Sequence, residues 1–422
     1  MGILFPLPVI RAMAAIKRHM AAVHGDLGLL SPEVSRAVMT AAREVEEGRW
    51  DGDFPVEVFQ TGSGTGSHMN VNEVLAGRAN EILTGARGGK RPVHPNDHVN
   101  MGQSTNDVVP SALHAATLIF WEKELFPALA RLLSALSGKA AEFSGVLRVG
   151  RTHFMDAVPM RLGDAFKGYA RQVSLGMERL ASARARLLEL PLGGTAVGNG
   201  LNTHPGAAAR VISLLASETG IPFTPAANRF EAQGARDAAV EASGALKTVA
   251  ASLWKMAQDL RFLSSGPDCG IGEIRVPALL PGSSFMPGKV NPVICEVLVQ
   301  AAAQVIGNDA AITTAALSGG LELCAAIPVI ARNLLESSLL LARAAQAFSE
   351  KCVEGLSADM ARTAGNVEKS LATVTLLAPI IGYDRAAALA KEAHASGRTV
   401  KSLALSRGLV TEEDWNAMLA KI

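Results

Sequence analysis

The sequence predicts an all-α protein built around a long central helical bundle. Hydrophobic residues make up 49% of the chain and aromatic residues only 5%, so Ala, Leu and Val carry the apolar mass, as is typical of closely packed helices. Residues 230–265 run without a proline, and two more long helices are expected to begin at Pro292 and Pro328. All three segments are apolar on more than one side. We therefore expect several copies of the chain to share one bundle.

Three regions along the chain differ in composition. Residues 1–110 are broken by Gly, Pro, Asn and Asp, which predicts an N-terminal domain of short helices and loops. Residues 111–360 hold the long helical patterns and form the predicted central bundle. Residues 361–422 predict a small C-terminal helical domain, with helices that stop near Gly382, Gly397 and Gly408.

The overall composition argues against several classes of protein. The chain has 422 residues, with 40 Lys and Arg against 39 Asp and Glu, so nothing indicates nucleic acid or an anionic membrane as a partner. The four cysteines form no C-x-x-C pair, and neither a disulfide framework nor a zinc ribbon is expected. No apolar run reaches about 18 residues without a charge. We expect a reduced, cytoplasmic protein without a membrane span.

One stretch, GSSFMPGKVNP (residues 282–292), mixes serines, a lysine and an asparagine with glycines and prolines. A phosphate-binding loop needs G-x-x-x-x-G-K-[ST], but here five residues separate Gly282 from Gly288, and Val290 takes the place of the Mg²⁺-binding hydroxyl. No strand–helix alternation surrounds the stretch, so a nucleotide site is not expected. A zinc hydrolase is not expected either, because H-E-x-x-H is missing and Pro95 follows His94.

Four polar loops, at residues 61–73, 91–107, 150–153 and 282–291, carry hydroxyl, amide and imidazole groups. Many neutral donors with a few cations suit a small polycarboxylate, because hydroxyl and amide groups pair with carboxylate oxygens and lysine adds a full charge. Taken singly, each loop is better explained by ordinary turn and helix-cap residues. The candidate binding residues are Ser63, Thr65, His94, Asn96, Ser104, Thr105, Asn106, Thr152, His153, Ser283, Ser284, Lys289 and Asn291.

Taken together, the loops resemble one family. GSSFMPGKVNP resembles the G-S-S-x-M-P-x-K-x-N-P signature of the fumarase/aspartase superfamily, whose shared chemistry is an elimination that releases fumarate. Other segments are similar to class II fumarases, in the same order and over nearly the whole chain. The resemblance implies a fumarate hydratase of the tricarboxylic acid cycle that interconverts fumarate and L-malate. The similar segments are TGSGTGSHMNVNE, VHPNDHVN, GQSTNDVVP, GRTHFMDAVP, LGGTAVGNGLNTHP, SGPDCGIGE and IGYD.

Aspartate ammonia-lyases, which belong to the same superfamily, are the main alternative. Ser63 and HPND (residues 94–97) favour a fumarase, whereas Thr105 is more typical of an aspartase. The chain departs from fumarases at His68, where Asn is usual, and at LELCAA (residues 321–326), where F-E-L-N-V is usual. It also begins without a GAQTQRS-like stretch. An inactive scaffold of the same fold is therefore a lesser alternative.

The resemblance also implies roles for individual residues. Ser283 is the base for the carbon-bound proton, and His153, oriented by Glu296, acts through a water. Lys289 and Asn291 hold the carboxylate that becomes an aci-carboxylate in a stepwise carbanion path. The implied substrate-binding set is Ser63, Gly64, Thr65, Ser104, Thr105, Asn106, Thr152, Ser284, Lys289, Val290 and Asn291. A second dicarboxylate site is implied at Arg91, His94, Pro95, Asn96 and Asp97, for which a solvated loop with an Asx turn is the other explanation.

The implied assembly is a homotetramer around a twenty-helix core, with smaller helical N- and C-terminal domains. Each active site would draw residues from three subunits, which agrees with apolar helices that need partners on several sides. Neither a metal nor an organic cofactor is implied.

Overall fold

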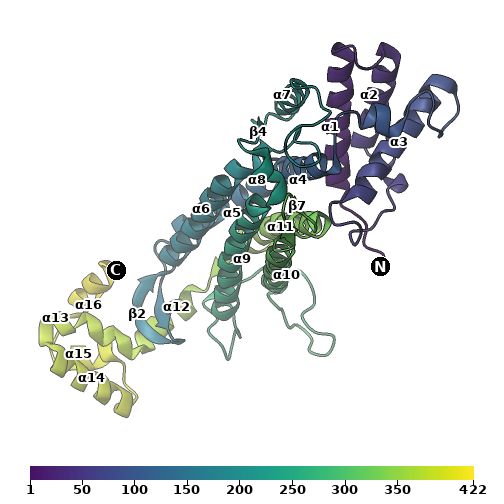
Figure 1. The fold of residues 1–422 in the computed structure, drawn as a ribbon. Coiled ribbons are helices and arrows are strands. Elements are labelled where there is room, and N and C mark those ends of the chain that lie inside the picture. Colours follow the sequence, from purple (N-terminus) through teal and green to yellow (C-terminus); the bar gives the residue numbers. More distant parts are fainter. The chain divides into compact units, whose positions relative to one another are not determined.

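The computed structural model describes residues 1–422 and is mainly helical (Figure 1). Strands are few and short, and only β1 (Leu147–Thr152) and β2 (Met155–Arg161) are longer than two residues. Both expected long helices are present as α10 (Val293–Ala316) and α11 (Ile327–Phe348). The prediction of an all-α fold with long helices is confirmed.

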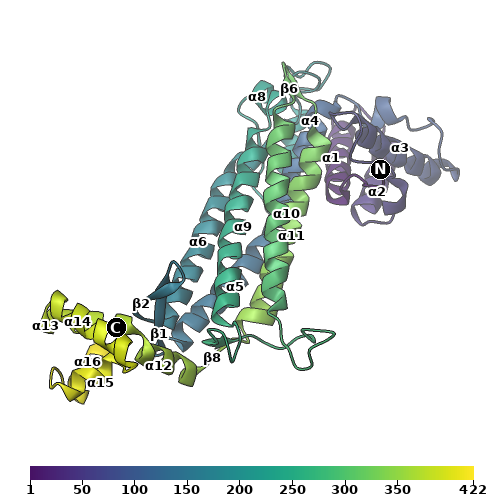
Figure 2. The ribbon, with the colours of Figure 1, turned by 90° about the horizontal axis from the view of Figure 1, so that it is seen from below.

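The chain divides into two compact units, each assembled from three separate segments. Unit 1 consists of Met1–Pro127, Gly176–Ala251 and Ala301–Arg343, and unit 2 of Ala128–Leu175, Ser252–Gln300 and Ala344–Ile422. Four long helices belong partly to each unit and are continuous in Figure 1 and Figure 2: α6 (Leu162–Leu187), α9 (Asp237–Leu263), α10 and α11. The two units are defined by contacts in space and not by position in the sequence. The predicted domain boundaries near residues 110 and 360 therefore stay predictions.

Unit 1 is organised around α1, which packs against α2, α4 and α7. Its helices are α1 (Leu7–Asp26), α2 (Pro32–Glu46), α3 (Thr65–Thr84), α4 (Thr105–Phe120), α7 (Ala207–Thr219) and α8 (Arg229–Gly234), with a 3-10 turn at Asp51–Asp53 and π-helical turns at Pro95–Val99 and Trp121–Leu125. Parallel β3 (Glu189–Leu190) and β4 (Thr224–Pro225), and antiparallel β6 (Gly319–Gly320) and β7 (Leu323–Cys324), join its loops.

Unit 2 contains the β1–β2 hairpin and the small helices of the C-terminal region. Leu389, Leu403 and Trp415 are the centre of a separate apolar cluster in that region. The remaining elements are α5 (Phe126–Glu142, of which the first two residues belong to unit 1), α12 (Met360–Lys369), α13 (Ala378–Ile381), α14 (Tyr383–Ser396), α15 (Val400–Ser406), α16 (Glu412–Ala420), antiparallel β5 (Ile274–Arg275) and β8 (Ser357–Ala358), a π-helical turn at Ser349–Val353 and a 3-10 turn at Leu371–Leu376.

Local sequence signals explain several helix ends. Ser104 and Asp107 form a capping box at the start of α4, because each side chain accepts a hydrogen bond from backbone at the other's position. In the C-terminal region Gly382 separates α13 from α14, Gly397 ends α14 and Gly408 follows α15, so the three predicted helix stops are confirmed.

The expectation of one uninterrupted helix over residues 230–265 is wrong. The segment is divided into α8 and α9 at Ala235 and Arg236. Arg236 is buried, and its Nη2 donates hydrogen bonds to the carbonyls of Ala232 and Gln233. The guanidinium thereby satisfies carbonyls at the end of α8, which lack partners within the helix. Gly234, the last residue of α8, stands directly before this break, but a single glycine inside a helical pattern does not by itself end a helix, so the pattern did not predict it.

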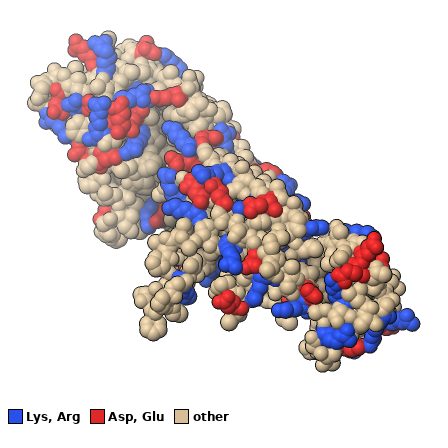
Figure 3. All heavy atoms as spheres, turned by 180° about the vertical axis from the view of Figure 1, so that it is seen from behind, with Lys and Arg blue, Asp and Glu red and all other residues tan.

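The surface carries no dominant charge. On the face drawn in Figure 3, basic and acidic side chains are interspersed, in keeping with the net charge of +1. None of the helices combines the length and the apolar character that crossing a membrane requires. The expected cytoplasmic location stays a prediction.

Candidate active site

The serine loop, residues 282–291 of unit 2, is closed by its own hydrogen bonds. Gly282 N–H donates to the carbonyl of Lys289 at 2.7 Å, and Asn291 Nδ2 donates to the carbonyl of Gly282 at 2.7 Å. A Cβ at position 282 would lie 2.3 Å from the Lys289 carbonyl oxygen, so only glycine fits there. Asn291, a predicted substrate ligand, therefore also fixes the shape of the loop.

The hydroxyl of Ser283 lies within this loop, and backbone donors point at it. Ser283 Oγ accepts hydrogen bonds from the N–H of Phe285 at 3.1 Å and of Met286 at 2.9 Å. Two donors aimed at one oxygen stabilise negative charge on it, as an oxyanion hole does. An ordinary serine turn contains the same two hydrogen bonds. They are therefore compatible with Ser283 as a turn residue and with Ser283 as the catalytic base. Three other predicted residues of the loop, Ser284, Lys289 and Val290, are exposed.

His153 occupies the turn of the β1–β2 hairpin. Thr152 pairs with Met155 at the end of the ladder, and the two residues between them, His153 and Phe154, have φ of 56° and 60°. Positive φ at both positions defines a type I′ turn, which favours Asn and Gly. Non-glycine residues there store backbone strain, which is common at functional sites. The His153 side chain is exposed, and the Phe154 ring lies 4.9 Å from the ring of Phe262.

A buried ion pair anchors this hairpin. Arg151 donates from Nη1 and Nη2 to the two carboxylate oxygens of Glu273, at 3.0 and 2.8 Å. The Glu273 side chain is completely buried and also accepts from Asn366 Nδ2 at 3.1 Å. Burial lowers the pKa of Arg151, but the hydrogen bonds and charge of Glu273 outweigh burial and raise it. Neither residue was predicted from the sequence, because they are 122 positions apart and no local pattern joins GRTH to GIGE.

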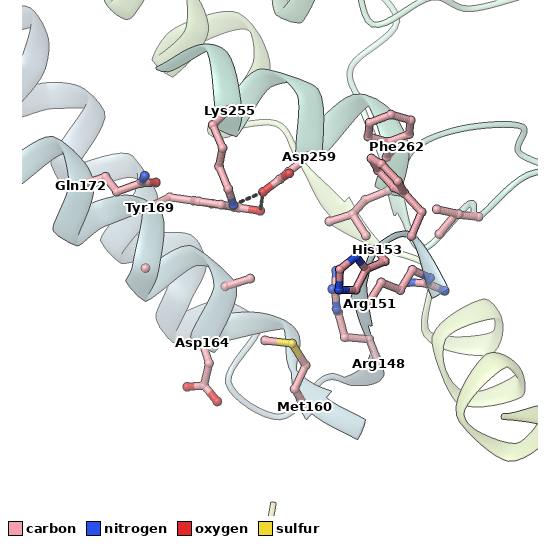
Figure 4. Close-up of a pocket in the computed structure, with 15 residues that line it drawn as sticks. Arg148, Arg151, His153, Met160, Asp164, Tyr169, Gln172, Lys255, Asp259 and Phe262 are labelled. Atoms are coloured by element: carbon pink, nitrogen blue, oxygen red, sulfur yellow. Dashed lines mark hydrogen bonds and ion pairs between the residues drawn. The ribbon is translucent and has the colours of Figure 1, made fainter. Parts of the chain in front are cut away.

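A cavity of about 640 Å³ opens beside His153 (Figure 4). Tyr169 O–H donates to Asp259 Oδ2 at 2.8 Å, and Lys255 forms an ion pair with the same carboxylate. Burial, followed by the charge of Asp259, raises the pKa of Tyr169 above its usual value, so the phenol stays a neutral donor. His153 therefore faces a cavity whose walls are partly polar and partly apolar. Further lining residues include Arg148, Arg151, Met160, Asp164, Gln172 and Phe262.

In unit 1 the GSGT segment (residues 62–65) lies where helices α3, α4 and α11 begin. The Gly62 carbonyl accepts from the N–H of Ile327 at 2.9 Å, which places the first turn of α11 beside the segment. A Cβ on Gly64 would lie 3.3 Å from Val109 Cγ1, which places α4 equally close. Helix N-termini carry positive partial charge. Three of them at one point favour an anionic ligand.

The predicted substrate residues of this region hydrogen-bond to one another and to a neighbouring loop. The hydroxyls of Ser63 and Thr65 are 2.8 Å apart. Ser104 Oγ accepts from the N–H of Asn106, whose Nδ2 donates to the carbonyl of Ala196 at 2.7 Å. The contact between Gly64 and Val109 of α4 makes GSGT and STND, at the start of that helix, one cluster in unit 1.

Asp107, which was not among the predicted site residues, connects the start of α4 to the loop that contains Gly193 and Thr195. Its Oδ1 accepts from Ser104 N–H at 3.0 Å, and its Oδ2 accepts from Gly193 N–H at 2.9 Å and Thr195 N–H at 3.1 Å. Burial raises the pKa of Asp107 to about 6, although these hydrogen bonds act in the opposite direction. The STND and LGGTAVGNG segments both carried the family resemblance, but only their contact in space reveals what Asp107 does.

The residues predicted for a second dicarboxylate site form a local turn. His94 Nδ1 accepts hydrogen bonds from the backbone N–H of Asn96 and Asp97, both at 3.2 Å, and caps the π-helical turn that Pro95 begins. The imidazole of His94 therefore caps this turn in the way that the side chain of Asn or Asp caps an Asx turn. An open cavity of about 810 Å³ lies beside the turn, lined by Lys90, Arg91, Pro92, His94, Asp97 and His98.

The predicted site residues are divided between the two units. The serine loop, His153 and Glu296 belong to unit 2, and the GSGT, STND and second-site residues belong to unit 1. Within the chain Glu296 lies 3.7 Å from Arg261 Nη2 and makes no hydrogen bond to His153, so that catalytic pairing stays a prediction. No three or more His, Cys, Asp and Glu side chains gather in a way that could hold a metal ion.

Solved structures identify the class of protein. A class II fumarase from Schistosoma mansoni superposes with a TM-score of 0.94 at 38% identity, over 99% of this chain and 90% of that one. A fumarate lyase:delta crystallin from Brucella melitensis, bound to cobalt, superposes with a TM-score of 0.95 at 42% identity, over 100% of this chain and 91% of that one. The fold is that of the fumarate lyases.

Sequence comparison narrows this class to one family. A family model described as "Lyase" matches residues 5–307, and one described as "Fumarase C C-terminus" matches residues 374–421. The class II fumarate hydratase of Nitrosomonas europaea is 51% identical over 97% of this chain and 89% of its own length. The mitochondrial fumarate hydratase of Homo sapiens is 49% identical over 97% of this chain and 80% of its own. The chain belongs to the class II fumarase family, as the signature loops predicted.

Proposed function

We propose that this protein catalyses the reversible hydration of fumarate to L-malate. The observation that carries this proposal is identity of about one half, over nearly the whole chain, to proteins named fumarate hydratase. The intact serine loop supports it, because the loop supplies both the base and the carboxylate ligands that the reaction needs. The bacterial and human relatives described above are both named fumarate hydratase, which gives no support to the ammonia-lyase alternative.

In the malate-to-fumarate direction, Ser283 removes the proton from C3, and the C–H electron pair moves onto the neighbouring carboxylate to form an aci-carboxylate. The electron pair then returns to form the C2–C3 double bond while the C2–O bond breaks. A proton delivered from the side of His153, through a water, lets hydroxide leave as water. The two backbone donors to Ser283 Oγ support this role, because a serine alkoxide is too unstable to act as a base without such stabilisation.

The carboxylates of the substrate would be held by two kinds of group. Lys289 and Asn291 are assigned to the carboxylate that gains charge, because an ammonium and an amide donor stabilise the extra electron pair. Hydroxyl and amide donors near three helix N-termini are assigned to the remaining oxygens. These are Ser63, Thr65, Ser104, Thr105 and Asn106, with Gly64, Thr152, Ser284 and Val290 completing the proposed set.

We propose that these groups meet in a homotetramer in which three subunits build each active site. The apolar exposure of Val297 and Ile306 on α10 supports this assembly. In this arrangement the Glu296 that orients His153 can belong to another subunit. The residues at 91–97 are proposed as a second dicarboxylate site, supported by Lys90 and Arg91 beside an open cavity.

The reaction is tested by incubating the purified protein with fumarate, with and without ammonium, and following fumarate absorbance and product NMR signals. We expect L-malate in both mixtures. Aspartate formed only with ammonium would replace the proposal with an ammonia-lyase. No turnover by a folded tetramer would favour an inactive scaffold.

Two substitutions test the catalytic roles. Ser283→Ala removes the base, and His153→Asn removes the imidazole while keeping a residue that tolerates a φ of 56°. We expect each variant to lose at least about a hundredfold in kcat, the range typical of general acid–base groups. Mass by light scattering and the circular dichroism spectrum should not change. Turnover within a few-fold of the unmodified protein in either variant would contradict its role.

A further inference from the structure

A buried histidine lies behind the proposed substrate hydroxyl of Thr105. His68 is near the start of α3 and Thr105 is the first residue of α4, and both side chains are buried. His68 Nδ1 and Thr105 Oγ1 are 2.8 Å apart, and the hydroxyl has no second hydrogen-bond partner within the chain. The orientation of the Thr105 O–H bond therefore depends on which of the two atoms donates.

The surroundings of His68 Nε2 indicate whether His68 or Thr105 donates this hydrogen bond. His68 Nε2 is buried and has no hydrogen-bond partner. Burial, followed by the positive charge of Lys17, keeps the pKa of His68 well below its usual value. The imidazole is therefore neutral and carries one N–H, on either Nδ1 or Nε2.

The two tautomers differ in cost and in effect. With the proton on Nε2, a buried N–H donor lacks an acceptor, and the O–H of Thr105 is used up on Nδ1. With the proton on Nδ1, the unpartnered atom is only an acceptor, which buried structures tolerate better than an orphaned donor. Thr105 then accepts from His68 and keeps its own O–H for another acceptor. The surroundings of the ring favour this second tautomer.

The backbone around Thr105 leaves little other freedom. Asp107 holds the start of α4 through Ser104, Gly193 and Thr195, as described above. Lys17 Nζ donates to Asn100 Oδ1 at 2.6 Å just ahead of the same segment. Because the backbone is held in place, the orientation of the Thr105 O–H bond is the main freedom left at this residue.

We infer that His68 is a positioning residue: as the Nδ1–H tautomer it donates to Thr105 Oγ1 and so directs the Thr105 O–H toward a carboxylate oxygen of the bound dicarboxylate. The inference rests on the proposed function, because it assigns Thr105 to substrate binding. It adds a residue that does not touch the substrate and acts only through Thr105.

The tautomer can be measured without turnover. Full-length protein labelled with ¹⁵N-histidine contains nine histidines, and His68→Asn identifies the signals of His68 by their loss. Solid-state NMR distinguishes a protonated Nδ1 from a protonated Nε2 by chemical shift. We expect the Nδ1–H form at neutral pH. The Nε2–H form would overturn the inference.

Kinetics then test the consequence with matched variants. In Asn the amide Nδ2 is as many bonds from Cα as the Nδ1 of His, so His68→Asn keeps a donor to Thr105, whereas His68→Leu removes it. We expect His68→Leu to raise KM for fumarate about tenfold with kcat changed by less than about threefold, the size of one lost hydrogen bond to substrate. We expect His68→Asn to keep KM within about twofold of the unmodified protein.

A double-mutant cycle shows whether His68 acts through Thr105. Thr105→Val should raise KM, and adding His68→Leu to it should raise KM no further. Equal KM in His68→Leu and His68→Asn, or additive effects in the cycle, would overturn the inference. If the unmodified protein does not hydrate fumarate, the proposed function fails. The NMR result, and calorimetric binding of the unreactive dicarboxylate succinate to the same variants, then decide the inference separately.

Discussion

At the scale of single residues, the Arg151–Glu273 pair holds the strand that leads into His153. Breaking a buried ion pair by removing one partner leaves an uncompensated charge, which costs about 3–5 kcal/mol. We expect Glu273→Gln to lower the free energy of unfolding by an amount in this range and to reduce turnover, because the hairpin turn loses its anchor. Urea unfolding and fumarate hydration measure the two effects.

Asp156 provides the control for this prediction. Its carboxylate lies 3.8 Å from Arg151 Nε, but its side chain is exposed. Exposed pairs contribute roughly 0–1 kcal/mol, so Asp156→Asn should change stability by no more than that. A loss of stability as large in Asp156→Asn as in Glu273→Gln would show that burial of Glu273 is not the cause.

Glu218 in unit 1 predicts a pH dependence of stability. Burial acts to raise its pKa, but hydrogen bonds from Arg18 and His19 outweigh burial and hold the pKa at about 2, below the usual 4.5. Because the folded pKa is the lower one, the stabilisation is complete above about pH 4.5 and is lost as the pH falls toward 2. Urea midpoints between about pH 5 and pH 3 should therefore fall more steeply in the unmodified protein than in Glu218→Gln.

Glu33 serves as the matched control, since it is an exposed glutamate of the same unit. Glu33→Gln should reproduce the slope of the unmodified protein. Parallel slopes in all three proteins would mean that Glu218 contributes nothing to acid unfolding.

At the scale of elements, the serine loop depends on Gly282. A methyl group there would meet the Lys289 carbonyl oxygen at 2.3 Å and the Asn291 nitrogen at 2.9 Å, so the loop must open. We expect Gly282→Ala to lose about a hundredfold in kcat/KM, the effect of misplacing catalytic groups by about an ångström. The unfolding free energy should change little, because most of the loop is exposed.

Gly288 lies in the same loop, so a substitution there tests whether any change in the loop lowers activity as much as Gly282→Ala. It has a φ of 79° and open space around a built Cβ, and Asn tolerates that backbone region. Gly288→Asn should keep activity within several-fold of the unmodified protein. Equal losses at positions 282 and 288 would point to general loop disruption.

Elements differ in how well the sequence predicts them. Proline marks the start of α10 and α11, and glycine marks the helix ends of the C-terminal region, because both residues act through their own backbone. The break between α8 and α9 depends on where the buried Arg236 finds carbonyls, and the hairpin turn at His153 and Phe154 lacks the Asn or Gly that announces a type I′ turn. Both are decided by packing around the segment.

At the scale of the whole molecule, α10 predicts the assembly. Only Glu296 and Asp309 are charged among its 24 residues, and Val297 and Ile306 are 47% and 40% exposed. Such a helix needs apolar partners on further sides. We expect light scattering to give four times the 44.0 kDa mass of one chain.

Val297→Arg should dissociate the tetramer and abolish hydration, whereas Val297→Ala should leave both intact. A buried, unpaired arginine is costly at an interface, while alanine removes only a small apolar area. Full activity in a monomeric Val297→Arg variant would contradict a site shared between subunits.

The sequence was sufficient for the family, because the signature loops are long and lie in a fixed order. It also supplied the candidate site residues, whose roles stay predictions. It did not indicate how those residues are held. Glu273, Asp107 and His68 act across 122, 86 and 37 positions of sequence, and no local pattern relates residues so far apart. Family resemblance thus predicted groups that would touch substrate, while the groups that fix them required the fold.

The two interleaved units also determine when the protein can fold during synthesis. The GSGT segment is complete early, but its hydrogen-bonding partner Ile327 leaves the ribosome more than 260 residues later, the two being at positions 62 and 327. Unit 1 ends at Arg343, and at about 5–20 residues per second its last segment arrives roughly 20–70 s after its first. The parts of α10 and α11 that belong to unit 1 are the last of its helices to be synthesised. Each unit therefore needs its last segment, Ala301–Arg343 in unit 1 and Ala344–Ile422 in unit 2, before its fold can be complete.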